Sequence, residues 1–320
     1  MEKIKIGAVV GCTASGKTAL SIALAKELGG EIISCDSMQI YRGMDIGTAK
    51  PTAEEMDGVP HHLIDICDPE DAYSCADFVR DATLAVEDIT SRGKLPIFCG
   101  GTGLYLDRFL RGGNSEIATS NEVVRRELEE YAEKNGVDAL HALLCELDPE
   151  SGEAIHKNNV KRVIRAIEIC MLSGRKKSEI DKENREMSDR YECAVIYPFY
   201  NDREILYERI NRRVDMMIEG GLVEETRRLI EGGVFEKSKT ASQAIGYKEI
   251  IPYIKGEASL EECVETLKIS TRKYAKRQLT WFNSKPYAQK ISMDEGGSLK
   301  TFEDIVNISK NYLNNMKIVL

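Results

Sequence analysis

The stretch GCTASGKT, residues 11–18, fits the pattern G-x-x-x-x-G-K-[ST] of a phosphate-binding loop. A short, β-branched apolar run at 3–10 precedes it, and a segment of helical periodicity follows and ends at Gly29 and Gly30. Residues 31–36, EIISCD, predict a second strand. Strand, glycine-rich loop, helix and strand in this order favour a true phosphate loop over a fortuitous turn.

Strands and helices continue to alternate after this unit. Residues 63–67 predict a strand, and Ser74 to Asp77 form a capping box that opens a helix through Ser91. Residues 95–103, LPIFCGGTG, predict a strand that runs into a second glycine-rich turn. We therefore expect an α/β fold, a parallel sheet flanked by helices as in P-loop NTPases.

The pattern changes after Gly112. From Thr119, where a capping box reaches Glu122, to Gly174 the sequence predicts only helices, and a polar stretch follows. One more strand is predicted at 194–200, and Ser259 to Glu262 form the capping box of a long C-terminal helix. The simplest organisation is a core of 1–115 and 193–320 with C-terminal helices, interrupted by a helical insertion at 116–192.

Composition excludes several classes of protein. The 320 residues carry a formal net charge of −9, so the surface as a whole does not suggest nucleic-acid binding. The nine cysteines form no C-x-x-C pair, and His61 and His62 are adjacent, which argues against a zinc site. With no signal peptide and no apolar window long enough for a membrane span, we expect a cytoplasmic chain with reduced thiols.

The residue types at the loop indicate phosphate chemistry. The loop consists of eight residues whose backbone N–H groups we expect to face phosphate oxygens: Gly11, Cys12, Thr13, Ala14, Ser15, Gly16, Lys17 and Thr18. Lys17 would add a positive charge, and the Thr18 hydroxyl would hold Mg²⁺. Nothing in this pattern distinguishes ATP from another diphosphate.

Two further side chains lie at predicted strand ends, where ligands bind in open parallel sheets. Asp36 is a candidate for holding metal-bound water, for a general base, or for a structural turn cap. Thr102, in GGTG, either faces the ligand or belongs only to a tight turn. Arg209, Arg212 and Arg213 share one helix and form either a diphosphate clamp or a solvated salt-bridge face.

Basic residues concentrate in two places. From Thr266 to Met293 there is no acidic residue, and Arg272, Lys273, Lys276 and Arg277 are spaced to stack along a helix with aromatic residues between them. A second cluster in the insertion contains Lys157, Lys161, Arg162 and Arg165. Each is either a solvated face or a nucleic-acid surface, and two in one acidic chain favour the latter.

Several segments together resemble the bacterial tRNA dimethylallyltransferases, also called tRNA isopentenyltransferases. They are GCTASGKT, DSMQIYRGMDIGTAKP (36–51), HHLIDICDPEDAYS (61–74), PIFCGGTGLYL (96–106), NNVKRVIRAIEI (158–169), QAIGYKEI (243–250) and RKYAKRQLTWF (272–282). The resemblance implies transfer of the isopentenyl group of dimethylallyl diphosphate to N6 of the adenine at tRNA position 37, 3′ of the anticodon, in tRNAs that read codons beginning with U.

The resemblance also implies residue roles. The phosphate loop would hold the diphosphate leaving group with Mg²⁺, Asp36 would be the general base, Thr102 would lie near the reacting centre, and Arg213 would belong to the diphosphate pocket. The insertion would grasp the anticodon stem. Residues expected to contact tRNA are Asp36, Ser37, Met38, Gln39, Thr102, Arg125, Lys161, Arg162, Val163, Ile164, Arg165, Gln243, Ala244, Ile245, Gly246, Tyr247, Lys248, Arg272, Lys276 and Arg277.

Two other functions stay open on the residues alone. A kinase using ATP would leave the basic clusters at Lys161 and Lys276 unexplained, and a non-enzymatic RNA-binding module would leave Lys17, Asp36 and Thr102 without a role. Adenylate isopentenyltransferases share the loop but use a free nucleotide, whereas the insertion and the basic clusters favour tRNA. The C-terminal zinc finger of some eukaryotic members is absent. We therefore expect a compact, zinc-free monomer.

Overall fold

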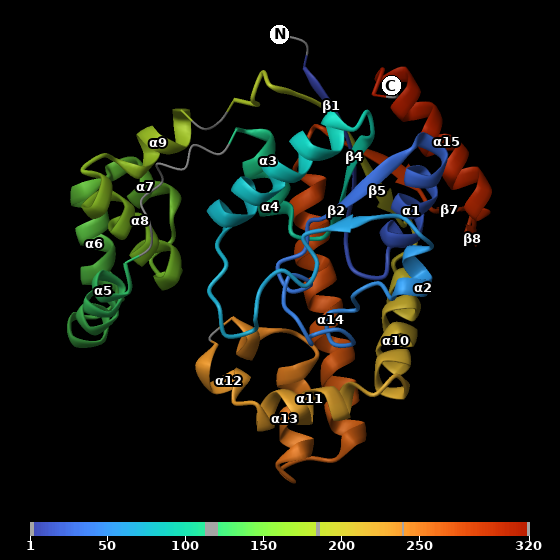
Figure 1. Cartoon of the computed structure of the whole chain (residues 1–320). Helices are drawn as coiled ribbons and strands as arrows, with labels where there is room; N and C mark the ends of the chain where they lie inside the picture. Colours follow the sequence, from blue (N-terminus) through green and yellow to red (C-terminus); the bar gives the residue numbers. More distant parts are fainter. Residues whose placement is uncertain (1–2, 113–120, 184–185, 239, 319–320) are drawn as a thin grey trace. The chain divides into compact units, whose positions relative to one another are not determined.

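The computed structural model describes residues 3–112, 121–183, 186–238 and 240–318. The chain divides into two compact units, a larger one of 1–109 with 189–320 and a smaller one of 110–188 (Figure 1). The insertion predicted at 116–192 begins and ends a few residues later than the smaller unit. Its predicted start and the proposed cap at Thr119 lie outside the described residues.

A parallel sheet forms the centre of the larger unit. The described residues give it six strands in the order β3-β2-β4-β1-β5-β6, with every neighbouring pair parallel. The strands are β1 (Ile4–Val10), β2 (Gly30–Ser34), β3 (His61–His62), β4 (Leu95–Gly100), β5 (Tyr191–Phe199) and β6 (Ala288–Ser292), and a small hairpin joins β7 (Asp294–Glu295) to β8 (Ser298–Leu299). The predicted α/β class with a parallel sheet is confirmed.

The helices of the larger unit pack against this sheet or against one another. They are α1 (Lys17–Leu28), α2 (Ala53–Met56), α3 (Cys75–Ser91), α4 (Gly103–Leu110), α10 (Arg203–Glu219), α11 (Leu222–Glu231), α12 (Val234–Lys237), α13 (Tyr247–Ile254), α14 (Leu260–Asn283) and α15 (Phe302–Asn315), with a 3₁₀ turn η1 at Ala241–Gln243. α15 packs against α1, and the long α14 packs against α10 and α13 (Figure 1). The end of β4 also meets α14, because Gln278 donates to the Gly101 carbonyl just after the strand.

Local sequence sets the helix boundaries. Two of the three predicted capping boxes are present, because Ser74 and Asp77 at α3, and Ser259 and Glu262 at α14, exchange side-chain and backbone hydrogen bonds. The third, from Thr119 to Glu122, is wrong, because the N-cap of α5 (Glu122–Asn135) is Asn121. Gly29 ends α1 in the left-handed region at φ 64°, as the sequence predicted.

The strand predicted at 63–67 is wrong. The strand in this region is β3 at His61–His62, which pairs with Ile32 and Ile33. Leu63 and Asp65 have φ values of 61° and 55°, which a strand does not accommodate. Cys67 makes only an isolated bridge to Tyr41. Alternating apolar residues in this stretch mark a half-buried loop and not a strand.

The described part of the smaller unit is helical. It consists of α5 (Glu122–Asn135), α6 (Val137–Leu147), α7 (Pro149–Ala154), α8 (Val160–Ser173) and α9 (Lys177–Glu183), the last inside the stretch that we predicted only as polar. Asn121 caps α5, accepting hydrogen bonds from the N–H groups of Val123 and Val124. Leu140, Leu144, Val163 and Ile167 are buried in its core. Among the described residues of both units, no helix is long and apolar enough to cross a membrane.

Candidate functional site

A cavity of about 410 Å³ lies in the larger unit, where β2 and β4 end next to the phosphate loop. Its lining includes Thr13, Lys17 and Thr18 from the loop and α1, Asp36 from the end of β2, and Arg213 from α10. Parallel strands place their carboxyl ends at one edge, so residues that are distant in sequence converge there. The cavity joins the loop and the aspartate that the sequence singled out.

The phosphate loop is held by side chains from two later helices. The Thr13 N–H donates to Gln278 Oε1 at 2.9 Å, and Arg209 Nε donates to the Ala14 carbonyl at 3.0 Å. Ala14 itself has a φ of 60°, unusual for a residue with a side chain. The loop conformation is therefore supported from α14 and from α10.

The expectation that every loop N–H turns toward a phosphate is corrected at three positions. The Gly11 N–H donates to the Gly100 carbonyl at 3.4 Å, the Ser15 N–H donates to the Cys12 carbonyl at 3.4 Å, and the Thr13 N–H is bonded to Gln278. These groups hold the loop in shape, since backbone donors must be satisfied wherever they are shielded from water. The amides expected to face a ligand are thus fewer than eight.

Lys17 and Arg213 give the cavity two positive side chains close together. Burial lowers the pKa of Lys17, and Arg213 lowers it further. Burial likewise lowers the pKa of Arg213, while Asp36 acts in the opposite direction. Lys17 Nζ donates to the Cys12 carbonyl at 3.2 Å. Two desolvated cations that repel each other make this end of the cavity a site for a multiply charged anion.

Asp36 and Thr102 belong to one small hydrogen-bonded turn. Asp36 Oδ1 accepts from the Met38 N–H at 2.9 Å, and the Thr102 hydroxyl oxygen accepts from the Ser37 N–H at 3.1 Å. The Thr102 N–H in turn donates to the Cys35 carbonyl at 3.1 Å. Asp36 and Ser37 line the cavity. Thr102 is therefore placed against the residue that follows Asp36.

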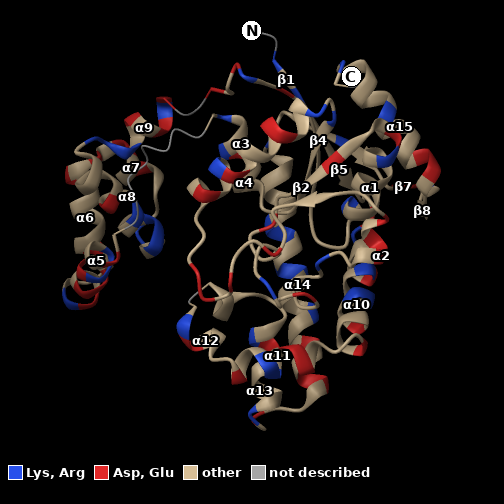
Figure 2. Cartoon of the chain, in the orientation of Figure 1, with Lys and Arg blue, Asp and Glu red and all other residues tan. Residues whose placement is uncertain are grey.

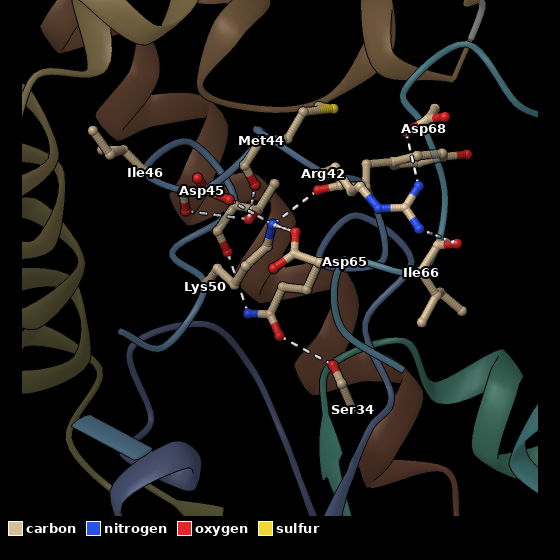
Figure 3. Close-up of polar contacts among 12 residues, drawn as sticks. Ser34, Arg42, Met44, Asp45, Ile46, Lys50, Asp65, Ile66 and Asp68 are labelled. Carbon is tan, nitrogen blue, oxygen red and sulfur yellow. Dashed lines mark hydrogen bonds and ion pairs between the residues drawn. The ribbon is translucent and has the colours of Figure 1, made fainter. Parts of the chain in front are cut away.

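The loop after Asp36 is folded around its own polar groups (Figure 3). Lys50 Nζ donates to the Tyr41 carbonyl at 2.8 Å and pairs with the carboxylates of Asp45 and Asp65, each at 2.5 Å. The Gln39 amide accepts from Ser34 Oγ at 3.1 Å and donates to the Ala49 carbonyl at 3.2 Å. Gln39 also lines the cavity. The long DSMQIYRGMDIGTAKP segment is thus an internally hydrogen-bonded wall of the site.

A buried carboxylate fixes the far end of this loop. Glu225 of α11 accepts hydrogen bonds from the N–H groups of Ile46 and Gly47, each at 3.0 Å, and from the Tyr247 hydroxyl at 2.7 Å. The Tyr247 ring occupies the space of a side chain at Gly47, because a Cβ there would lie 2.3 Å from Tyr247 Cζ. Burial and the Glu225 carboxylate raise the pKa of Tyr247, so this phenol stays protonated.

One face of α14 runs along the cavity. Leu267, Thr271, Tyr274 and Gln278 are spaced by four, three and four residues and all line it, as does the exposed Arg277, whose guanidinium lies over the Tyr274 ring. Lys276 is exposed, while Arg272 is half-buried and donates to Asn211 Oδ1 at 2.6 Å. Figure 2 shows the basic residues along this helix.

The segment 243–248 contributes to the site unevenly. Gln243, Ala244, Ile245 and Lys248 line the cavity. Tyr247 is fully buried and Gly246, at φ 112°, carries the bend before α13. The four lining residues are placed for ligand contact, whereas Gly246 and Tyr247 shape the segment.

The basic residues of the smaller unit fall into two groups. Lys161 and Arg162 are exposed on α8. Arg125 and Arg165 donate to the buried Glu168 at 3.1 and 2.6 Å, respectively. Val163 and Ile164, named with them from the sequence, lie in the core of the unit, so their side chains face other helices.

Neither the cysteines nor the histidines suggest another chemistry at the site. Burial raises the pKa of Cys12 to about 11 despite the nearby Lys17, so this thiol remains protonated. His62 Nε2 lies 2.8 Å from the buried Glu31, and His61 Nδ1 lies 2.8 Å from the Val59 carbonyl. Within the described residues no group of three or more histidine, cysteine or acidic side chains is arranged to hold a metal.

Sequence reasoning missed several residues of the site. Gln278 and Tyr274 were quoted only as part of a basic helix, and Glu225 was not singled out. Tyr274 and Gln278 are four residues apart and therefore share one face of a helix. This spacing would have predicted both as site residues if that face had been expected to contact the phosphate loop. The sequence did not indicate a role for Glu225, because the backbone groups at 45–47 to which it is bonded are distant in the sequence.

Comparisons with known protein families agree with one another. The family model described as IPP transferase matches residues 39–285, and the model described as isopentenyl transferase matches residues 4–68. The chain is 50% identical over 283 residues, 88% of its length and 89% of the relative's, to a tRNA dimethylallyltransferase of Halalkalibacterium halodurans. A tRNA dimethylallyltransferase of Bacillus mycoides is also 50% identical, over 89% of both chains.

Two solved structures share the fold. The full-length tRNA isopentenylpyrophosphate transferase from Bacillus halodurans superposes with a TM-score of 0.72 at 46% identity, covering 98% of this chain and 97% of that one. A eukaryotic dimethylallyltransferase acting on tRNA gives a TM-score of 0.81 at 30% identity, covering 98% of this chain and 80% of that one.

Proposed function

The chain belongs to the tRNA dimethylallyltransferase family and prenylates an adenine of tRNA, and we propose that it does so within the cavity described above. In this proposal the donor is dimethylallyl diphosphate and the acceptor is N6 of the adenine at position 37, in tRNAs that read codons beginning with U. The C1–oxygen bond of the donor breaks, a C1–N6 bond forms, and diphosphate leaves with the bonding electron pair.

The leaving group binds at the positive end of the cavity. Negative charge grows on the diphosphate as the allylic carbon departs, and Lys17 and Arg213 lie where they would offset it. Their lowered pKa values reflect burial and mutual repulsion, both of which an anion relieves. Arg209 and Gln278 support the loop that cradles the same group.

Asp36 takes the proton that N6 loses. The N6 lone pair is delocalised into the purine ring, so a base and close positioning both assist attack. Asp36 lines the cavity, its Oδ1 is oriented by the Met38 N–H, and Thr102 braces the neighbouring Ser37. An adenine must leave the anticodon-loop stack to reach this position, as in other enzymes that act on bases.

The residues at the loop fit a magnesium ion. Thr18 and Asp36 line the same cavity and offer oxygen ligands, and Mg²⁺ commonly takes one or two protein ligands with substrate phosphates completing its shell. When bound, the ion would neutralise charge on the diphosphate. Thr18 is the residue that we assign to hold it.

Basic side chains on two helices hold the tRNA. Lys276 and Arg277 are exposed on α14, and Lys161 and Arg162 are exposed on α8. Contacts of such residues with phosphates position an RNA, whereas unstacked loop bases carry the sequence information. We further propose that the protein acts as a monomer in the cytoplasm, which size-exclusion chromatography with light scattering and cell fractionation would test.

One observation carries the assignment. Lys17, Arg213 and Asp36 line a single cavity whose walls also include apolar residues, among them Val214, Met217 and Leu267. A kinase would fill this space with a polar phosphate acceptor, whereas a prenyl donor needs room for an apolar chain. The apolar part of the lining therefore favours prenyl transfer.

The direct test uses isotopically labelled dimethylallyl diphosphate, Mg²⁺ and tRNA transcripts with adenine or guanine at position 37. We expect label in the adenine transcript and an equal amount of diphosphate. Asp36→Ala should lower kcat by roughly 10²–10⁴-fold with tRNA affinity retained. Label in the guanine transcript, or an Asp36→Ala enzyme that turns over normally, would refute the assignment.

A further inference from the structure

We propose that Gln278 is a positioning residue for prenyl transfer, holding the phosphate loop in register with the turn that carries Thr102. The inference rests on the proposed function, since it takes the loop as the cradle of the leaving group. Gln278 is buried at 6% exposure on α14 and lines the cavity.

The side chain bridges two backbone segments. Its Oε1 accepts from the Thr13 N–H at 2.9 Å, and its Nε2 donates to the Gly101 carbonyl at 3.0 Å. An N–H can only donate and a carbonyl can only accept, so the partners fix which end of the amide faces which segment. Glutamine supplies both functions, whereas glutamate and methionine each lack at least one.

One of the two segments belongs to the diphosphate end of the proposed site, and the other to the end that carries Asp36. Thr13 belongs to the loop that ends in Lys17 and Thr18. Gly101 precedes Thr102, whose hydroxyl accepts from the Ser37 N–H beside Asp36. One amide therefore connects the side that binds the leaving group with the side that activates the nucleophile. Displacements of about 1 Å in such an alignment lower rates by about 10²-fold.

The close packing at Gly101 fits this role. A Cβ at Gly101 would lie 2.2 Å from Gln278 Nε2 and 3.2 Å from the Gly11 carbonyl oxygen. The glycine thus makes room for the amide, and its backbone reaches the phosphate loop as well. A larger residue at Gly101 would therefore displace the Gln278 amide from the Gly101 end of its two hydrogen bonds.

The test measures steady-state kinetics of Gln278→Glu and Gln278→Met. Glutamate keeps an acceptor for Thr13 but cannot donate to Gly101, and methionine keeps the length without either bond. We expect kcat to fall about 10²-fold for both variants. The KM for tRNA should stay within about twofold, because the basic surface of α14 is unchanged.

The matched control is Gln289→Glu on β6, which makes the same charge change at an exposed glutamine whose side chain donates to the neighbouring Lys290 carbonyl at 3.2 Å. We expect it to keep wild-type kcat. Thermal unfolding accompanies each measurement. If Gln278→Met does not fold, the kcat of Gln278→Glu tests the proposal, because this substitution preserves the side-chain volume and the bond to the Thr13 N–H. A kcat within twofold of wild type in the folded Gln278 variant would overturn the proposal.

A double-mutant cycle with Gly101→Ala separates positioning from general packing. We expect Gly101→Ala alone to lower kcat, and the pair with Gln278→Met to be no slower than the slower single variant, because both changes break one bridge. Losses that multiply would show that the two residues act independently and would overturn the proposal.

Failure of the proposed function is distinguishable from failure of this inference. If wild-type protein transfers no prenyl group to tRNA, the proposed function fails whatever the variants do. If the wild-type enzyme transfers the group and the folded Gln278 variants match its kcat, only the positioning role fails.

Discussion

Two pairs of basic side chains, one pair in each unit, are used in opposite ways. In the smaller unit, Arg125 and Arg165 both donate to the buried carboxylate of Glu168. Within the described part of the larger unit, neither Lys17 nor Arg213 forms an ion pair, although both are desolvated enough to have lowered pKa values. The first arrangement carries its own counter-charge and holds helices together. The second leaves the counter-charge to a ligand.

The pKa values express the same difference. Burial alone would raise the pKa of Glu168, but hydrogen bonds from Arg165, the Asn121 N–H and Arg125 hold it below its ordinary value. Charges matched in this way stabilise one another, whereas unmatched half-buried cations destabilise the fold until an anion arrives. For these residues, the interaction partner, and not the residue type, therefore indicates whether a basic side chain stabilises the fold or binds a ligand.

Replacing an unmatched cation should affect activity and spare the fold. Lys17→Met should lower kcat/KM for the prenyl donor by about 10³-fold, near the upper end of effects for a single group that stabilises developing negative charge. The unfolding temperature should stay equal or rise, because a desolvated charge is removed. Steady-state transfer assays measure kcat/KM, and calorimetric melting measures the unfolding temperature. A normal kcat/KM or a marked fall in the unfolding temperature would contradict the assignment of Lys17 to ligand binding.

A buried carboxylate of the smaller unit should show the reverse pattern. Asp148 accepts hydrogen bonds from the backbone and hydroxyl groups of Ser151 and Ser178. Burial acts to raise its pKa, but the bonds from these serines outweigh it and lower the pKa to about 2 from an ordinary value of 3.8. Since the folded value lies below the unfolded one, the carboxylate stabilises the unit above about pH 4.

This stabilisation should be lost as the pH falls from about 4 to about 2, and should amount to roughly 2 kcal/mol. Asp148→Asn should lower the free energy of unfolding by a similar amount at neutral pH. The stability of this variant should then fall less as the pH decreases. Hydrogen exchange of the α7 and α9 amides in the whole protein measures the effect. Equal acid sensitivity of the variant and the wild type would contradict it.

The smallest effect concerns exposed cations that have neither a buried partner nor a place in the cavity. Replacing both Lys161 and Arg162 by glutamine should weaken tRNA binding by about tenfold at low salt. The slope of log affinity against log salt should flatten by about 1.5, because two phosphate contacts are lost. Filter binding across a salt series measures this, with Lys255→Gln and Lys310→Gln on the larger unit as the charge-matched control. An unchanged slope would remove these residues from the tRNA surface.

The sequence predicted the parts of the site that are local. The phosphate loop depends on spacing within eight residues, and the caps at Ser74 and Ser259 depend on spacing within four, so both were predictable. Asp36 followed from its place at the end of a strand. The family resemblance supplied Arg213, because a helical arginine alone was equally compatible with a solvated face.

What the sequence could not predict depends on contacts between distant segments. Gln278 meets Thr13 across 265 positions, and Glu225 meets Gly47 across 178. The stretch 63–67 has the alternation of a strand, but its carbonyl and amide groups are used by the 36–50 loop instead, as in the bond from the Asp65 N–H to the Gln39 carbonyl. Tertiary pairing, not local preference, decided its conformation.

The most direct test is calorimetric binding of inorganic diphosphate, in the presence of Mg²⁺, to wild-type protein, Arg213→Met and Arg165→Met. The two variants make the same chemical change, one at an unmatched cation of the cavity and one at a cation bonded to Glu168. We predict that Arg213→Met weakens diphosphate binding by at least tenfold, while Arg165→Met leaves the affinity within twofold and lowers stability. Equal diphosphate affinities in the two variants would contradict the account.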